Sequence, residues 1–468
     1  MSEMTGLQTA LSGLMAQRTA LETIGQNIAN ASTVGYHRQR VDMTSVGAPA
    51  QNALWSRWEG PGQGVAVTGI SRSYDQFLTS QSRAAHADNA YLAGQQQVLG
   101  TVEQAIGEPS DTGLASQLSA FWGAWQDVAN NPTSSSVRTA LLQRAQTLAS
   151  GFNQVTNAIS QVWQTSRTQA DTLAQTVTAQ AQQVAHLNGA IQTAVAAGGS
   201  PNDLMDQRDT LVDQMASEVG ATATVETNGT VTVYLGGSAL VRGTVTRGLA
   251  VTGPSSFTGV PSPAGAPVVG LTWADDGSAV GFAGGQIGAA LDAVNTSLPG
   301  WRDRMDTVAA AVTSQVNAQQ AAGYDANGGV GQPIFSGTTA GSLTVVMTDP
   351  NLIAASAVAP APGPPPVPSA DGTNALNMGQ IGAAAGAPDA LYRSVVADLG
   401  VAASTANTRA QVQDQVTTQA DSALESSSGV SIDEEAASLV QYQRAYEASA
   451  RYLSTVDSIL DTLINHVS

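Results

Sequence analysis

The sequence predicts an elongated, multidomain α+β protein with paired N- and C-terminal coiled-coil helices, a long-helix bundle as its body and an inserted β-rich outer domain. Three observations lead to this prediction. Three segments carry apolar residues in a heptad-like three-and-four alternation, and two of these segments are the chain ends. A β-like pattern lies between the second and third segments. The length of 468 residues suits about three domains.

The N-terminal segment predicts one amphipathic helix. Leu7, Leu14, Leu21 and Ile28 recur every seven residues, so they form one apolar stripe. The run of polar and small residues from 30 to 35 then ends the helix.

The second segment, residues 137–197, predicts a single very long helix. Its apolar positions keep the same alternation throughout, and Gly198, Gly199 and Pro201 close it. About 60 residues at 1.5 Å each give a rod of about 90 Å, which favours an elongated body.

The C-terminal segment predicts a second terminal helix. Ser431 and Glu434 have the spacing of a capping box at its start. A lone helix with one apolar stripe is unstable in water, so the two terminal helices are expected to pair with each other or with copies in neighbouring subunits. The residues predicted to form this subunit-assembly coiled coil are Leu7, Leu14, Leu21, Ile28, Leu439, Tyr442, Tyr446, Leu453, Val456, Leu460 and Leu463.

Between the long helix and the C-terminal helix, residues 221–284 are predicted to be β-rich. Asn228-Gly229 between two strand-like runs predicts a hairpin with a type I′ turn, in which both residues need positive φ. A helix is expected from Ile287 to Ala322, followed by short strands and a Pro-rich stretch at 360–368. Helical character resumes near Ala390.

These patterns define the expected domains. Residues 1–34 and 430–468 are the terminal coiled-coil helices, which are expected to pair in an oligomeric core and to be disordered in the monomer. Residues 35–220, 285–325 and 385–429 form the helix-rich elongated body. Residues 221–284 with part of 326–384 form the β-rich outer insertion.

Composition excludes several classes of function. The chain has 36 acidic and 18 basic residues, the latter all Arg, and a net charge of −18. This charge opposes binding to nucleic-acid phosphates and to anionic membranes. The absence of cysteine excludes disulfides, thiolate metal sites and cysteine nucleophiles. The N-terminus lacks the pattern of a cleaved signal peptide, and no apolar run of about 20 residues is present.

No motif predicts an enzyme, a cofactor or a metal. The four histidines, His37, His86, His186 and His466, lie far apart in sequence. Asp325-Ala-Asn-Gly resembles the start of a calcium loop, but required ligands are missing, so a glycine-rich turn is expected. The acidic run 433–435 falls in the first turn of a helix, where negative charges interact favourably with the helix dipole.

The chain ends resemble the bacterial flagellar axial proteins. The stretch SGLMAQRTALETIGQNIANASTVGYHRQRV is similar to the N-terminal signature of rod, hook and hook-associated proteins. The C-terminal DEEAASLVQYQRAYEASA resembles the family of flagellar hook-associated protein 1, the first hook–filament junction proteins, as do interior segments such as DLMDQRDTLVDQMASEVG. The motif residues are Asn27, Ile28, Ala29, Asn30, Gly35, Tyr36, Asp433, Glu434, Glu435, Gln443 and Tyr446.

The resemblance implies a structural junction protein that polymerises as a short helical layer between hook and filament. In such a layer the terminal coiled-coil helices form an inner tube and the middle domains pack outside it. It implies export through the flagellar type III apparatus without a cleaved signal, an extracellular location, and an export chaperone that shields the C-terminal stripe. The implied partners are further copies of the chain, the hook protein and the second junction protein. The alternatives are a hook or distal-rod subunit, or a type III secreted effector.

Overall fold

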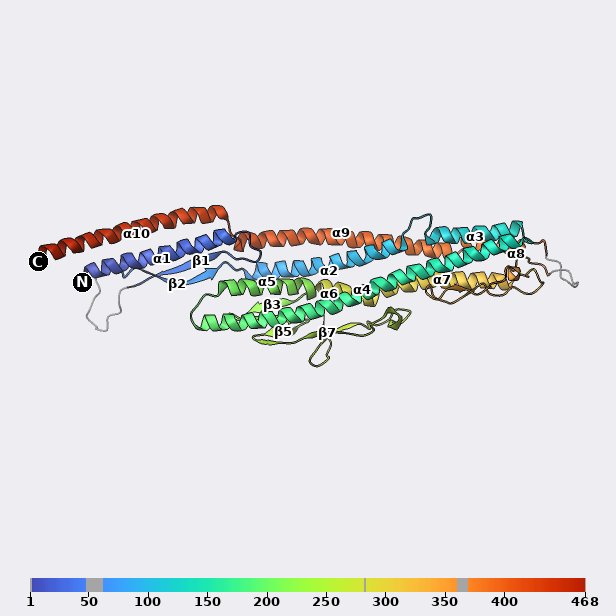
Figure 1. Cartoon of the computed structure of the whole chain (residues 1–468), viewed down its shortest axis with the longest axis horizontal. Helices are drawn as coiled ribbons and strands as arrows, with labels where there is room; N and C mark the ends of the chain where they lie inside the picture. The colour runs from blue at the N-terminus through green and yellow to red at the C-terminus, as the bar shows by residue number, and fades with distance from the viewer. Residues whose placement is uncertain (1, 48–61, 282, 360–368, 468) are drawn as a thin grey trace. The chain divides into compact units, whose positions relative to one another are not determined.

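The computed structural model describes residues 2–47, 62–281, 283–359 and 369–467, with side chains from residue 6 to residue 462 of these ranges. The fold is α+β, as predicted, with long helices and four small antiparallel sheets among the described residues (Figure 1). The chain forms two compact units. The first comprises residues 1–87, 177–248 and 414–468, and the second comprises residues 88–176 and 249–413. Helices α2 (Gln76–Ile106), α4 (Ser135–Ala196) and α9 (Pro388–Ser428) contribute to both.

In the first unit, the two chain ends pair. Helix α1 (Ser2–Asn30) lies antiparallel to α10 (Ile432–Val467), because Gly6 lies beside Val456 and Asn27 beside Glu435 (Figure 1). Helix α1 also packs on a hairpin of β1 (Gln39–Ser45) and β2 (Val65–Arg72), which the sequence analysis did not predict. The Ser12 hydroxyl accepts a hydrogen bond from the Val65 amide at 3.2 Å.

The buried face of α1 is not the predicted leucine stripe. Apart from Ile24, small and polar residues fill it, because α1 approaches α10 and the hairpin at once and leaves little space for long side chains. At Gly13, for example, an added Cβ would lie 3.3 Å from the Ser449 hydroxyl. The buried residues of α1 are Ala10, Ala16, Ala20, Thr23, Ile24 and Asn27.

The remainder of the first unit is α5 (Asn202–Val219) and a four-stranded sheet in the order β3-β4-β5-β6. The strands are β3 (Thr222–Val225), β4 (Val231–Leu235), β5 (Ser238–Arg242) and β6 (Val245–Thr246). The predicted hairpin is present, but its turn is not type I′. Gly229 has φ +84°, whereas Asn228 does not have a positive φ. The turn instead spans Glu226 to Gly229, whose amide donates to the Glu226 carbonyl at 3.0 Å.

The second unit contains α3 (Leu114–Asn130), α6 (Gly285–Asp292), α7 (Leu298–Ala321) and α8 (Thr373–Gln380). The predicted helix 287–322 is interrupted by a π-helical segment, η2 (Ala293–Ser297), between α6 and α7. Two short antiparallel pairs accompany these helices, β7 (Leu249–Thr252) with β8 (Gly270–Trp273) and β9 (Phe335–Ser336) with β10 (Thr344–Val345). The 3₁₀ turns are η1 (Phe257–Gly259), η3 (Pro350–Leu352) and η4 (Ile381–Ala383).

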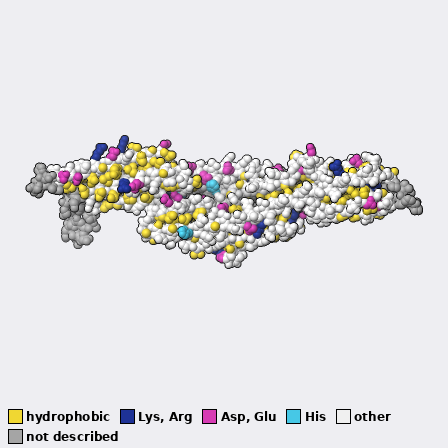
Figure 2. Space-filling view, viewed as in Figure 1, with side chains coloured by type: hydrophobic (Ala, Val, Ile, Leu, Met, Phe, Trp, Pro, Cys, Tyr) yellow, Lys and Arg dark blue, Asp and Glu magenta, His cyan; other side chains and the backbone are white. Residues whose placement is uncertain are grey.

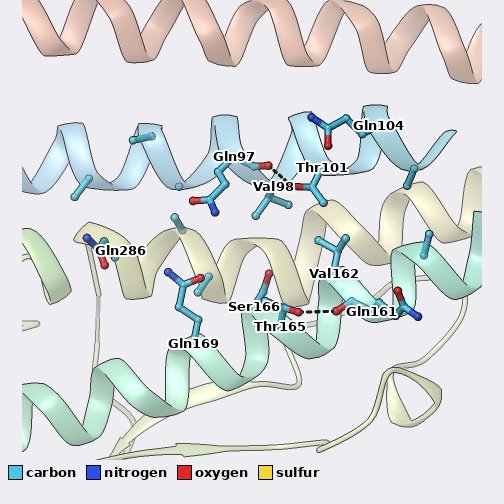
Figure 3. A pocket seen from close by; sticks show the side chains of 17 residues that line it. Gln97, Val98, Thr101, Gln104, Gln161, Val162, Thr165, Ser166, Gln169 and Gln286 are labelled. Carbon is cyan, nitrogen blue, oxygen red and sulfur yellow. Dashed lines mark hydrogen bonds between the residues drawn. The ribbon is translucent and has the colours of Figure 1, made fainter. Parts of the chain in front are cut away.

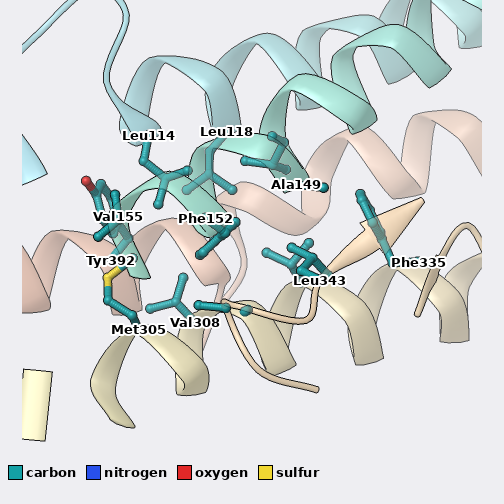
Figure 4. Packing of buried hydrophobic residues seen from close by; sticks show 14 of the residues in the cluster. Leu114, Leu118, Ala149, Phe152, Val155, Met305, Val308, Phe335, Leu343 and Tyr392 are labelled. Carbon is teal, nitrogen blue, oxygen red and sulfur yellow. The ribbon is translucent and has the colours of Figure 1, made fainter. Parts of the chain in front are cut away.

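The core of the second unit is a continuous apolar cluster. Side chains from α3, α4, α7 and α9 meet in it, and Phe335 enters from β9 (Figure 4). Phe121 and Trp125 of α3 form an edge-to-face aromatic pair in this core. The predicted long helix agrees closely with α4. After Ile159 the buried band widens to include Trp163 and Ala170, while Val177, Val184 and Ile191 of the predicted stripe stay buried.

The expected domain boundaries differ from the two units. The terminal helices share one unit with the hairpin, α5 and the four-stranded sheet. The predicted β-rich insertion 221–284 is not one domain, because β3–β6 belong to the first unit and β7–β8 form a separate sheet in the second. Hydrophobic patterning alone does not show which strands share a sheet. The Pro-rich stretch 360–368 lies outside the described residues.

Candidate functional site

Asn27 and Glu435 join the two ends of the chain. Glu435 is 2% exposed, and its carboxylate accepts hydrogen bonds from Asn27 Nδ2 at 2.9 Å and from Arg38 Nε at 2.7 Å. Asn27 is fully buried at the end of α1, while Glu435 lies in the first turn of α10. We call Asn27, Tyr36, Arg38, Gln39 and Glu435 the terminal latch.

Every hydrogen-bonding position of the Asn27 amide is occupied. Nδ2 donates to Glu435 and to the Gln39 carbonyl at 2.8 Å. Oδ1 accepts from the Gln39 backbone amide and from the Tyr36 hydroxyl, both at 2.9 Å. An amide can make four such bonds, so no other residue type of this size satisfies the site. This explains why the N-terminal motif places Asn, Tyr and the start of a strand at this spacing.

Arg38 links the latch to the start of α10. Its NH1 donates to Glu434 at 2.7 Å, and its backbone amide donates to the Ser428 carbonyl at 3.0 Å. Only one of the two hydrogen bonds of the predicted capping box is formed. The Ser431 hydroxyl accepts from the Glu434 amide at 3.5 Å, but the Glu434 carboxylate pairs with Arg38 and not with the Ser431 amide. The charge pairing with Arg38 outcompetes the neutral cap.

The loop between α1 and β1 rests on α5. Gly35 has φ +79°, and a Cβ there would clash with the Thr210 hydroxyl, so the motif requires glycine. His37 Nδ1 lies 2.8 Å from Asp206 Oδ1. Burial, together with the charges of Asp203, Asp206 and Glu435, raises the pKa of Tyr36 to about 12. The Tyr36 hydroxyl therefore stays protonated and donates to Asn27.

A buried ion-pair network anchors α5 beneath this loop. Arg72 donates to Asp206 at 2.8 Å and pairs with Asp209 at 2.6 Å, and Arg208 pairs with Asp209 at 3.2 Å. Burial alone would raise the pKa of Asp209, but Arg72, Arg208 and Arg83 outweigh it and hold the pKa below its ordinary value. Sequence reasoning did not single out these residues. The one available signal was the density of charges in DLMDQRDTLVDQ within a chain that is poor in charge.

The chemistry of this site is structural. Its carboxylates are engaged with arginine, asparagine or histidine side chains, and its tyrosine is a fixed donor. Within the described residues, no cluster of three or more His, Asp or Glu side chains could hold a metal ion. None of the described helices is long and apolar enough to span a membrane.

A separate cavity of about 690 Å³ lies within the second unit. Figure 3 shows its walls from α2, α4 and α6, with Gln97, Gln161, Gln169 and Gln286 among the lining side chains. Thr101 and Thr165 donate their hydroxyls to carbonyls of their own helices. None of the residues that line the cavity is an acid, a base or a histidine. Without such groups, the cavity offers no general acid or base.

The structure places the predicted assembly residues on partly exposed faces of the terminal helices. Only Val456 is buried, and Ile28 and Tyr446 are exposed. The Leu463 side chain lies outside the described residues. The half-buried members are Leu7, Leu14, Leu21, Leu439, Tyr442, Leu453 and Leu460.

The motif residues divide into three groups. Asn27 and Glu435 are buried, Tyr36 is half-buried, and all three join the latch. Gly35 shapes the loop and Asn30 ends α1. The remaining motif residues have exposed side chains and lie outside the latch, although one of them, Glu434, pairs with Arg38. They are Ile28, Ala29, Asp433, Glu434, Gln443 and Tyr446.

Apolar side chains gather on the surface over α1 and α10 (Figure 2). Met15 is 63% exposed and Tyr452 is 49% exposed. Other large apolar residues exposed on the two helices include Leu11, Val440 and Ile459. Contiguous exposed apolar surface of this kind marks an interaction site.

Comparison with known proteins agrees with this arrangement. The model of the flagellar hook-associated protein FlgK helical domain matches residues 99–335. Residues 7–37 match the flagella basal body rod protein model, and residues 421–466 match the flagellar basal body rod FlgEFG protein C-terminal model.

Relatives cover almost the whole chain. Flagellar hook-associated protein 1 of Escherichia coli is 26% identical over 98% of this chain and 99% of its own length. The Bacillus subtilis protein of the same name is 28% identical over 99% of this chain and 98% of its own length. The flagellar hook junction protein FlgK from Burkholderia pseudomallei, at 18% identity, has the same fold. It superposes with a TM-score of 0.62 over 74% of this chain and all of its own.

Paired terminal helices and their two matching signatures define the class, a flagellar axial protein. Within that class, the chain belongs to the family of the hook-associated protein FlgK, the structural proteins of the hook–filament junction.

Proposed function

We propose that this chain polymerises as a short helical layer between hook and filament, and that the exposed faces of α1 and α10 make the contacts between copies. The observation that carries the proposal is the apolar surface on these two helices after they have paired within one chain. Burying about 1,000 Å² of such surface between copies is a strong driving force for assembly.

The terminal latch would prepare this surface. It holds the end of α1 and the start of α10 in one register, so that the two apolar faces are presented together. A preorganised surface loses less conformational entropy on assembly than two separate helices do.

The proposed partners are the hook protein on one side of the layer and the second junction protein on the other. We further propose that the chain reaches this extracellular position through the flagellar type III apparatus, without a cleaved signal peptide. An export chaperone would cover the C-terminal apolar face before export. No nucleic acid, membrane or cofactor enters this function.

The test is Leu460→Asp, which places a charge at a half-buried position of α10, next to Ile459 of the exposed apolar face. We expect cells that carry it to lose filaments from their hooks and to lose motility, because burying an unpaired charge costs several kcal/mol. The matched control is Val401→Asp. Val401 lies on α9 in the second unit and is 68% exposed. The control should assemble normally. Normal filaments with Leu460→Asp would contradict the proposal.

A further inference from the structure

A groove runs across the first unit beside the loop of the terminal latch. A cavity of about 430 Å³ lies between the 33–36 loop, the end of α1 and α5. A second cavity of about 470 Å³, between α4 and α5, shares Gln207 and Thr210 with the first. The two cavities are therefore neighbours along α5, and together we call them the α5 groove.

The α5 groove has an apolar end and an acidic end. Leu187 of α4 and Leu211 of α5 are the apolar residues of one end, where Gln183 and His186 also line the cavity. Asp203, an exposed residue whose carboxylate accepts from Gln39 Nε2 at 3.2 Å, lines the other. Val34, 90% exposed, lies on the rim of the acidic end.

A stripe of matching chemistry lies on the outward face of α1. Leu11, Met15 and Arg18 follow one another at spacings of four and three residues, so they share one face of the helix. The Arg18 side chain is 74% exposed and pairs with Glu22 of the same helix at 2.9 Å. The stripe thus has two apolar residues followed by one positive charge.

The two surfaces match in length as well as in charge. Leu11 and Arg18 are seven residues apart, about 10 Å along α1. Leu211 and Asp203 are eight residues apart, about 12 Å along α5. An antiparallel approach would place the apolar residues together at one end and Arg18 against Asp203 at the other.

A single copy cannot make this contact with itself. Asn30, at the end of α1, already borders the groove. Arg18 lies twelve residues earlier on the same helix, about 18 Å away along its axis. An α1 stripe that docks in the groove must therefore come from another molecule.

We propose that the α1 stripe of one copy (Leu11, Met15 and Arg18) docks in the α5 groove of the next. Because the two surfaces are different patches of one unit, the contact is head-to-tail and generates a helical layer. This inference rests on the proposed assembly of copies into a layer, and it specifies which surfaces meet.

The first test uses cysteine cross-linking, since the chain has no cysteine of its own. Met15→Cys combined with Gln207→Cys should give disulfide-linked chains when isolated hooks that carry the assembled protein are oxidised. Either single variant should give none, and neither should Met15→Cys combined with Val401→Cys of the second unit. Antibody labelling must first show the protein at the hook tip.

The second test reverses the charges. Arg18→Glu and Asp203→Arg should each lower the fraction of hooks that carry a filament by about fivefold, and the double variant should restore it. Arg409→Glu, an exposed arginine in the second unit, is the control and should have no effect. Circular dichroism of each purified variant checks that α5 has folded.

The outcomes separate the two proposals. Protein at the hook tip with no Met15–Gln207 cross-link, or a double reversal no better than the single ones, overturns the docking of α1 in the groove and leaves the layer proposal standing. Cross-links from α10 residues to Gln207 would assign the groove to the other terminal helix and overturn the docking as stated. Absence of the parent protein from the hook tip would overturn the layer proposal itself.

Discussion

The Glu435 carboxylate lies 2.9 Å from the Asn27 side-chain amide, although 408 residues separate the two along the chain. Both are buried, and each carries further hydrogen bonds to the 36–39 segment. The N-terminal and C-terminal signatures of the family therefore describe two halves of one site.

Removing the Glu435 carboxylate should loosen both chain ends. Glu435→Ala leaves the buried Asn27 amide without one acceptor and Arg38 without its main partner. A buried group left unsatisfied costs about 1–3 kcal/mol. We expect amide hydrogen exchange to accelerate in residues 27–39 and 432–440 of the full chain, while the second unit is unchanged.

Glu434 supplies the matched control for this change. Its carboxylate pairs with the same arginine but is 64% exposed, so Glu434→Ala should cost less than about 1 kcal/mol. Equal exchange rates in the two variants would show that the latch does not hold the ends together.

The ion-pair network under α5 should make stability depend on acid pH. The lowered pKa of Asp209 means that the folded state favours the carboxylate. Its contribution is fully present above the unfolded pKa of about 3.9 and is lost as the pH falls through the folded pKa. Asp209→Asn should cost about 3 kcal/mol or more near neutral pH, because Arg72 and Arg208 lose a buried partner.

Urea unfolding of both proteins between pH 7 and pH 2 measures this effect. The difference in free energy of unfolding should be constant above about pH 5 and shrink below about pH 4. A difference that stays constant down to pH 2 would show that Asp209 is not the titrating group.

The sequence predicted the long helices well because their patterns are local. The limits of α1, α4 and α10 follow from apolar periodicity and end signals. The leucines of the predicted α1 stripe are only half-buried, because the close approach of α10 and the hairpin favours alanines such as Ala16 and Ala20 on the buried face. The pairing of Asn27 with Glu435 depends on contacts across nearly the whole chain, which no periodicity records. Only the family resemblance pointed to both residues.

The turn between β3 and β4 should be more sensitive at Gly229 than at Asn228. Gly229→Ala forces a side chain onto a residue with φ +84° and places its Cβ 3.3 Å from Ile191 and Val195, so we expect a loss of about 1–2 kcal/mol. Asn228→Ala removes only the hydrogen bonds that its side chain accepts from Thr230, at 3.1 and 2.7 Å, so about 1 kcal/mol is expected. Thermal unfolding of the two variants, monitored by hydrogen exchange in β3 and β4, shows which substitution costs more stability. A larger loss for Asn228→Ala would mean that the side-chain bonds, and not the backbone, determine the turn.

A chain without residues 1–34 and 430–468 should lose the β1–β2 hairpin but keep the second unit. The hairpin packs on α1, and the Gln39 backbone forms two hydrogen bonds with Asn27, so removal of the ends leaves these groups open to water. The apolar core of the second unit contains no residue from either deleted segment. Calorimetry should therefore show the transition of the second unit near its temperature in the full chain. Hydrogen exchange should show residues 39–45 and 65–72 unprotected, whereas removal of 430–468 alone, which spares α1, should leave most of their protection. A hairpin that stays protected without either end would mean that α5 holds it and that α1 adds nothing to its stability.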